Sequence, residues 1–155
     1  MRTTNQTSRS YALAQTVLLC VFAGAFFLTA GPALFVSTAS KVAGAVLCVI
    51  GLLLMFSALA SIRGAVQIAP EPRADAQLVT SGIYRRLRHP IYSAILLLVV
   101  GLFLRKPTVA VGVAAAVIIA FLLMKVRVEE KLLLARYPQY ADYKRHSWGL
   151  MPWLR

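Results

Sequence analysis

The stretch that decides the fold covers residues 108–126 and reads TVAVGVAAAVIIAFLLMKV. Apart from Thr108 and Lys125, every residue in it is apolar or glycine. A helix needs about 20 apolar residues to cross the hydrocarbon core of a bilayer. The stretch is therefore predicted to be a transmembrane helix.

Three further apolar runs precede it, at residues 11–30, 41–62 and 90–104. The third run is short. The first run follows Arg2 and Arg9 and could also serve as a signal peptide. Its length and a poor cleavage sequence favour an uncleaved span. The whole chain is 59% hydrophobic and 14% charged, where soluble domains carry about 25% charge. The sequence predicts an all-α polytopic integral membrane protein with about four transmembrane helices and a cytosolic C-terminal helical extension.

We expect one membrane-embedded domain over residues 1–155, in which residues 1–62 form an N-terminal helical pair and residues 63–155 carry the motifs. Glycine and alanine recur every seven residues in the second run, at Gly44, Gly51 and Ala58. Small residues at this spacing let helix backbones approach closely in membranes. They therefore predict helix packing and no chemistry.

Basic residues are distributed unevenly between the two sides that four spans define. Fourteen of the 17 Lys and Arg residues fall on the side of both termini, and only Lys41, Arg105 and Lys106 fall on the other. All five acidic residues share the first side. The positive-inside rule therefore places both termini, and the active site with them, in the cytoplasm. We expect a protein of the bacterial inner membrane. The net charge of +12 is attributed to topology and anionic lipid, with no nucleic-acid partner.

One cytoplasmic segment, residues 78–92, reads LVTSGIYRRLRHPIY and enters the third span. The TSG at residues 80–82 predicts a turn. Pro90 suits the first turn of a helix, which places His89 at the helix N-terminus, where free N–H groups attract anions. The arginines are typical of an interfacial belt at headgroup depth. Tyr84, His89 and Tyr92 together favour a binding site, because a membrane anchor needs no histidine.

A second cytoplasmic segment, KVRVEEKLLLAR, begins at Lys125 and continues the fourth span without a helix breaker until Pro138. One interpretation is a solvated helix end, in which Lys125 pairs with Glu129 and Arg127 with Glu130. The other is a functional site, because carboxylates beside the hydrocarbon boundary are costly. The third and fourth spans are joined by three residues, so the two segments should meet in one pocket. The residues expected to converge there are His89, Tyr92, Lys125, Arg127, Glu129 and Glu130. No spacing typical of a metal site is present.

The ordered pieces LVTSGxYxxxRHPxY and Glu129-Glu130 resemble the isoprenylcysteine carboxyl methyltransferase family. The related phospholipid N-methyltransferases share the paired glutamates. The tail YPQYADYKR, which starts at Tyr137, is also similar to the ending of this family. The likeness covers roughly residues 70–152.

This resemblance implies an S-adenosyl-L-methionine-dependent methyltransferase with a cytosolic cofactor pocket and a lipid-linked or amphipathic acceptor. The cofactor contacts carried over by motif position are Gln77, Leu78, Val79, Tyr84, His89, Pro90, Ile91, Tyr92, Glu129 and the adjacent Glu130. The family has an arginine for the substrate carboxylate one turn before the first glutamate; here Lys125 holds that position, and Arg127 follows two residues later. Both are therefore candidates for positioning the acceptor.

The substitution of lysine for arginine leaves the acceptor open, because lysine cannot hold a carboxylate in a planar fork. A phospholipid N-methyltransferase and a thiol methyltransferase on the same scaffold are the enzymatic alternatives. The non-enzymatic alternative is a small structural or partner-binding membrane protein that uses its basic face on anionic lipid.

Overall fold

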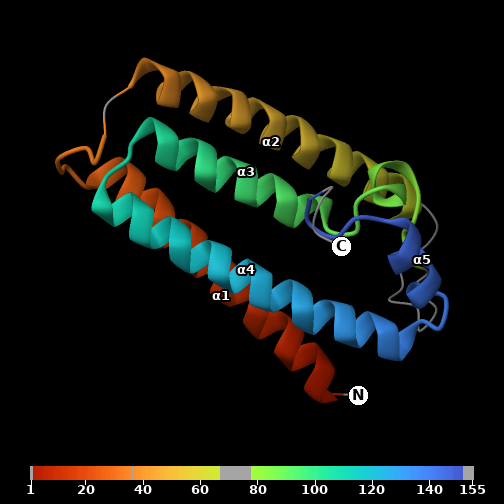
Figure 1. Ribbon diagram of the computed structural model, residues 1–155. Helices are drawn as coiled ribbons and strands as arrows, with labels where there is room; N and C mark the ends of the chain where they lie inside the picture. Colours follow the sequence, from red (N-terminus) through yellow and green to blue (C-terminus); the bar gives the residue numbers. More distant parts are fainter. Residues whose placement is uncertain (1, 36, 67–77, 152–155) are drawn as a thin grey trace. The chain divides into compact units, whose positions relative to one another are not determined.

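The computed structural model describes residues 2–35, 37–66 and 78–151, and this part of the chain is all-helical, as predicted (Figure 1). The elements in chain order are α1 (Arg2–Leu28), α2 (Thr38–Val66), the short 3₁₀ helix η1 (Gly82–Arg85), α3 (Pro90–Arg105), α4 (Val109–Arg136) and α5 (Tyr140–His146). The described residues form no strand, and an isolated parallel bridge joins Leu87 to Trp148.

Three helical segments are long and apolar enough to cross a membrane: Ser10–Leu28, Thr38–Ile62 and Val109–Arg136. The apolar helix α3 has 16 residues, or about 24 Å at 1.5 Å per residue, against a hydrocarbon core of about 30 Å. The predicted third span is thus a helix, and a short one. At 28 residues, α4 is longer than the core and continues as one helix through both glutamates.

The chain forms two compact units. The first consists of Met1–Cys48 and Val99–Val128, and the second of Val49–Leu98 and Glu129–Arg155. In the first unit α1 lies beside α4 (Figure 1), with the rings of Tyr11 and Phe121 6.2 Å apart.

The start of α2 packs closely against the end of α3 within the first unit. A Cβ atom added to Gly44 would lie 2.5 Å from the Gly101 carbonyl oxygen and 2.9 Å from Cγ of Arg105. A Cβ added to Gly101 would in turn lie 2.8 Å from Sγ of Cys48. Only glycine permits this approach, so the predicted packing role of Gly44 is confirmed.

In the second unit the rest of α2 packs against the beginning of α3. A Cβ on Gly51 would lie 3.1 Å from the Ala94 carbonyl oxygen, and Ala58 is fully buried. The expected turn before η1 is present, with Gly82 at φ +58°, a conformation that favours glycine. The Ile83 N–H then donates to Oγ of Ser61 at 3.3 Å, which attaches η1 to α2.

Candidate functional site

The C-terminal segment holds the start of α3 within the second unit. The Arg88 N–H donates to the Trp148 carbonyl at 2.8 Å, and the His89 N–H donates to the Gly149 carbonyl at 3.4 Å. The Ser93 hydroxyl donates to the Leu150 carbonyl. The N–H groups of Arg88 and His89, which directly precede α3, are therefore already accepted by the tail carbonyls.

Arg88 is the centre of a buried polar cluster. Its Nε donates to Oε1 of Glu130 at 2.8 Å, and its Nη1 donates to the Ser147 carbonyl at 2.5 Å. Its side chain is 2% exposed. The interfacial-belt prediction is thus wrong for this arginine. A guanidinium can be buried when it is ion-paired and hydrogen-bonded. The partners of Arg88 come from two segments distant in sequence.

Glu130 belongs to the same cluster and does not line the cavity described below. Its Oε2 accepts from Nζ of Lys144 at 2.6 Å, and its Oε1 lies 3.5 Å from Nε2 of His89. Helix spacing predicts Arg127 as the partner of Glu130, whereas the structure pairs Glu130 with Arg88 and Lys144. Glu130 therefore connects α4 to Arg88 and α5.

Glu129 faces a different set of groups. Its Oε1 accepts a hydrogen bond of 2.6 Å from the Tyr92 hydroxyl, and its Oε2 lies 3.9 Å from Nδ1 of His89. The rings of His89 and Tyr92 stack at 5.7 Å with an interplanar angle of 12°. The first residues of α3 and the end of α4 thus present one carboxylate against two aromatic rings.

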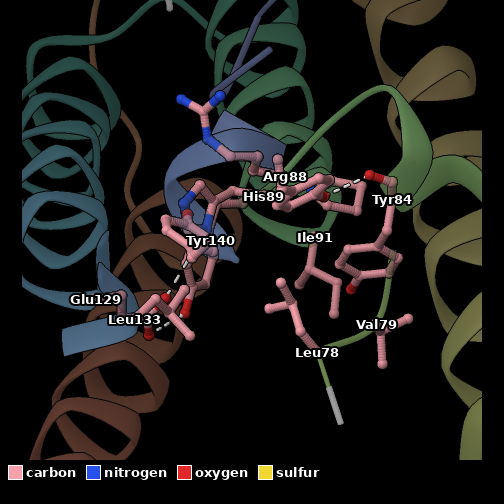
Figure 2. A pocket seen from close by; sticks show the side chains of 12 residues that line it. Leu78, Val79, Tyr84, Arg88, His89, Ile91, Glu129, Leu133 and Tyr140 are labelled. Atoms are coloured by element: carbon pink, nitrogen blue, oxygen red, sulfur yellow. Dashed lines mark hydrogen bonds and ion pairs between the residues drawn. The ribbon is translucent and has the colours of Figure 1, made fainter. Parts of the chain in front are cut away.

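These groups surround a cavity of about 250 Å³, shown in Figure 2. In that view Tyr84, Ile91, Leu78 and Val79 lie on one side and Glu129, Leu133 and Tyr140 on the other. The lining residues are Leu78, Val79, Tyr84, Arg88, His89, Pro90, Ile91, Tyr92, Glu129, Leu133, Tyr140 and Tyr143. The structure therefore brings together eight of the ten residues that the resemblance assigns to the cofactor.

Three tyrosines line this cavity outside the membrane-spanning helices. Burial raises the pKa of Tyr84 and of Tyr140 above the ordinary value. Burial also raises the pKa of Tyr143 to about 12, with Arg88 opposing the shift. All three are neutral hydroxyls at neutral pH. The Tyr143 hydroxyl donates to the Tyr84 carbonyl, whereas the buried Tyr140 hydroxyl has no hydrogen-bond partner within the described ranges.

Four lining residues were not among the predicted site residues. Leu133 lies one helical turn after Glu129, a spacing that could have identified it. Tyr140 and Tyr143 stand in the tail that resembles the family ending, which was another usable signal. Arg88 stands in the RHP motif, but its burial depends on partners 42 and 59 residues away in the sequence. Local sequence therefore did not indicate that it lines the cavity.

The remaining predicted residues have other surroundings. Gln77 lies outside the described residues. Lys125 belongs to the first unit, where it is buried and its Nζ donates to Oε1 of Gln15 on α1 at 2.7 Å. Arg127 is exposed on α4. The partner of Lys125 lies 110 residues away, so the sequence did not predict it.

Comparison with known proteins gives matches of two kinds. Residues 39–140 match the family described as Phospholipid methyltransferase. Cobalt-zinc-cadmium resistance protein CzcN of Cupriavidus metallidurans is 36% identical over 83 residues, and nickel-cobalt-cadmium resistance protein NccN of Alcaligenes xylosoxydans xylosoxydans is 35% identical over 83 residues. Each match covers 52% of this chain but 38% of the relative. No solved structure matches the chain significantly.

Proposed function

The chain belongs to the phospholipid methyltransferase family, and we propose that it transfers a methyl group from S-adenosyl-L-methionine to an amphipathic or lipid-linked acceptor. The observation that supports this cofactor is the cavity of the second unit. Its lining combines the Glu129 carboxylate, the His89 ring and tyrosine rings with apolar side chains.

The chemistry of the cavity fits the cofactor group by group. The cofactor carries an ammonium and a sulfonium, which are attracted to the Glu129 carboxylate and to aromatic faces. Its adenine requires apolar contacts of the kind that Leu78, Val79 and Ile91 offer. The buried Tyr140 hydroxyl, which lacks a partner within the described ranges, supplies a polar contact. The volume of about 250 Å³ lies just below the usual range of ligand pockets, about 300–1,000 Å³.

The protein side chains would act by binding and orientation. When bound, the cofactor supplies an activated methyl group. Tyr92 fixes the Glu129 carboxylate through its hydrogen bond, and the stacked ring of His89 limits the rotation of Tyr92. No side chain has to act as a nucleophile. An acceptor carboxylate is already ionised at pH 7 and needs no general base, so catalysis would consist of alignment and exclusion of water.

The acceptor side of the proposal rests on α4. Lys125 stands one helical turn before Glu129, at the position that the resemblance assigns to acceptor binding. We infer that Lys125 attracts the anionic group of an isoprenylcysteine-like carboxylate, with Arg127 as the neighbouring cation. Lys125→Ala should then reduce turnover of an anionic acceptor and spare cofactor binding. An amine acceptor, as in phospholipid N-methylation, or a thiol should be methylated equally by parent and variant.

The cytoplasm is the proposed location of the cofactor cavity, with the chain in a bacterial inner membrane. Support for this orientation comes from the bias in basic residues. Cysteine labels at residue 150 should react from the cytoplasmic side and labels at residue 106 from the other side. Labelling of residue 106 from the cytoplasm would contradict the orientation.

The deciding experiment is a calorimetric titration of detergent-solubilised protein with S-adenosyl-L-methionine and its demethylated product. Both should bind the parent protein. Glu129→Gln should weaken binding by on the order of 1–3 kcal/mol, because a charged hydrogen-bonded partner is lost. The matched control is Lys131→Gln, an exposed position two residues further along α4, which should bind as the parent does. Absence of binding at millimolar cofactor would reject the proposed function.

A further inference from the structure

A second cavity, of about 210 Å³, lies within the first unit. It is enclosed by the segment between α1 and α2 and by the turn between α3 and α4. Its lining includes three basic side chains, Lys41, Arg105 and Lys106, and the hydroxyl residues Ser37 and Ser40. These are the three basic residues that the sequence assigns to the non-cytoplasmic side.

Several contacts fix the walls of this cavity. The Leu34 N–H donates to the Pro107 carbonyl at 2.7 Å, which joins the two connecting segments. Lys106 donates from Nζ to the Thr29 carbonyl at 2.8 Å and also to the Phe26 carbonyl. Lys106 is thereby committed to the end of α1. The cavity is therefore built by tertiary contacts rather than by chance exposure of side chains.

Lys41 and Arg105 are the two cations left to act on a ligand. Both are exposed, and neither has an ion-pair partner within residues 2–35, 37–66 and 78–151. The close packing at Gly44, three residues after Lys41, places Cγ of Arg105 against α2. The two positive side chains are thus held on neighbouring helices.

No internal counter-charge is available in this unit. All five acidic residues of the sequence lie at positions 71, 75, 129, 130 and 142, outside the segments that form the first unit. Two cations that line one cavity without an acidic neighbour attract an external anion, which would offset their mutual repulsion. An arginine fork beside a lysine point charge matches phosphate oxygens.

We propose that this cavity binds a phosphate group, provided either by an anionic lipid headgroup or by a free phosphate anion. The Ser37 hydroxyl adds a donor beside the two cations, and the Ser40 hydroxyl, which donates to the Ser37 carbonyl at 2.8 Å, holds this segment in place. The exposed apolar side chains of Phe35 and Val42 adjoin the site in sequence and offer contact to an acyl chain. The site shares no lining residue with the cavity of the second unit.

The test measures the thermal unfolding midpoint of the full-length chain in detergent. Phosphatidylglycerol, phosphatidylcholine and inorganic phosphate are titrated separately. Phosphatidylglycerol should raise the midpoint of the parent, because a ligand bound to the native state stabilises it by mass action. The Lys41→Gln/Arg105→Gln double variant should need at least about tenfold more phosphatidylglycerol for the same rise, since two charged contacts are lost.

The matched control is Arg85→Gln/Arg86→Gln, which removes the same charge from exposed positions in the second unit. It should respond as the parent does. Lys41→Gln alone tests the site again should the double variant fold poorly, because Lys41 is exposed at the start of α2. A rise with inorganic phosphate equal to that with phosphatidylglycerol supports the site and identifies a free anion as its ligand.

Three results would overturn the inference. The first is a parent midpoint unchanged by either anion, and the second is an equal rise with phosphatidylcholine and phosphatidylglycerol. The third is a double variant that responds like the parent. Cofactor titration of the same preparations reports separately on the proposed methyltransferase function.

Discussion

The two cavities differ in how their charges are balanced. In the cavity of the second unit, Arg88 is paired with Glu130 and backbone carbonyls, and Glu129 accepts from Tyr92. In the first unit, Lys41 and Arg105 share a cavity without any acidic residue of their unit. The balanced cavity is organised to present one carboxylate to a cationic ligand, whereas the unbalanced one favours an anion.

The largest effect on stability is expected at the Arg88–Glu130 ion pair of the second unit. Arg88→Met leaves the partly buried Glu130 with fewer donors and removes the hydrogen bonds to the Ser147 and Lys144 carbonyls. Breaking a buried ion pair by removing one partner costs about 3–5 kcal/mol. The free energy of unfolding, measured by denaturant titration in mixed micelles, should fall by that amount.

Lys144→Met is the matched control for this prediction. Lys144 contacts the same carboxylate, but its side chain is 39% exposed, and exposed ion pairs contribute about 0–1 kcal/mol. Equal losses in the two variants would show that burial of the Arg88 pair does not distinguish the second unit.

A smaller effect on stability is expected from the contact between α2 and α3 beside the cavity of the first unit. Gly44→Ala places a methyl group 2.5 Å from the Gly101 carbonyl oxygen, and overpacking of this kind costs about 1–3 kcal/mol. Gly24→Ala, where nothing lies within 4 Å, should leave stability unchanged or slightly raised, because alanine favours a helix. The thermal midpoints of both variants check this difference.

If the anion site depends on that packing, Gly44→Ala should also weaken the response to phosphatidylglycerol, while Gly24→Ala should not. If the Gly44→Ala protein is destabilised but responds to phosphatidylglycerol as the parent does, the anion site does not depend on the contact at Gly44.

The next effect concerns the orientation of Glu129. Tyr92→Phe keeps the ring that stacks on His89 but removes the hydrogen bond to the carboxylate. Cofactor affinity should fall by about 0.5–1.5 kcal/mol, the usual net value of one hydrogen bond. Calorimetry measures it, and an affinity equal to that of the parent would show that Tyr92 does not orient Glu129.

The last effect, which vanishes at neutral pH and is therefore the smallest under ordinary conditions, is a pH dependence. Tyrosine has an ordinary pKa of about 10, and burial raises the pKa of Tyr143 to about 12. Between these values the unfolded chain loses the proton first, so the free energy of unfolding should fall as pH rises from about 10 to about 12. Tyr143→Phe should decline less steeply in the same alkaline titration. An identical slope in parent and variant would contradict this assignment.

Much of the fold was readable from short stretches of sequence. Hydropathy predicted the helical runs, and the absence of a breaker predicted that α4 continues through Glu129 and Glu130. The turn ending at Gly82 was likewise predicted from its residues. Most of the cavity lining was indicated by motif resemblance, because the segment before α3 is continuous in sequence. These features depend on local chain preference and on the thickness of the bilayer.

The partners of the charged side chains were decided only by the tertiary structure. Arg88 meets Glu130 from 42 residues away, Lys125 meets Gln15 from 110 residues away, and Lys41 shares a cavity with Arg105. Hydropathy and helix spacing describe only neighbours within a turn or two. Whether a charge is neutralised, buried or left to attract a ligand depends on contacts between distant segments, which exist only once the helices have packed.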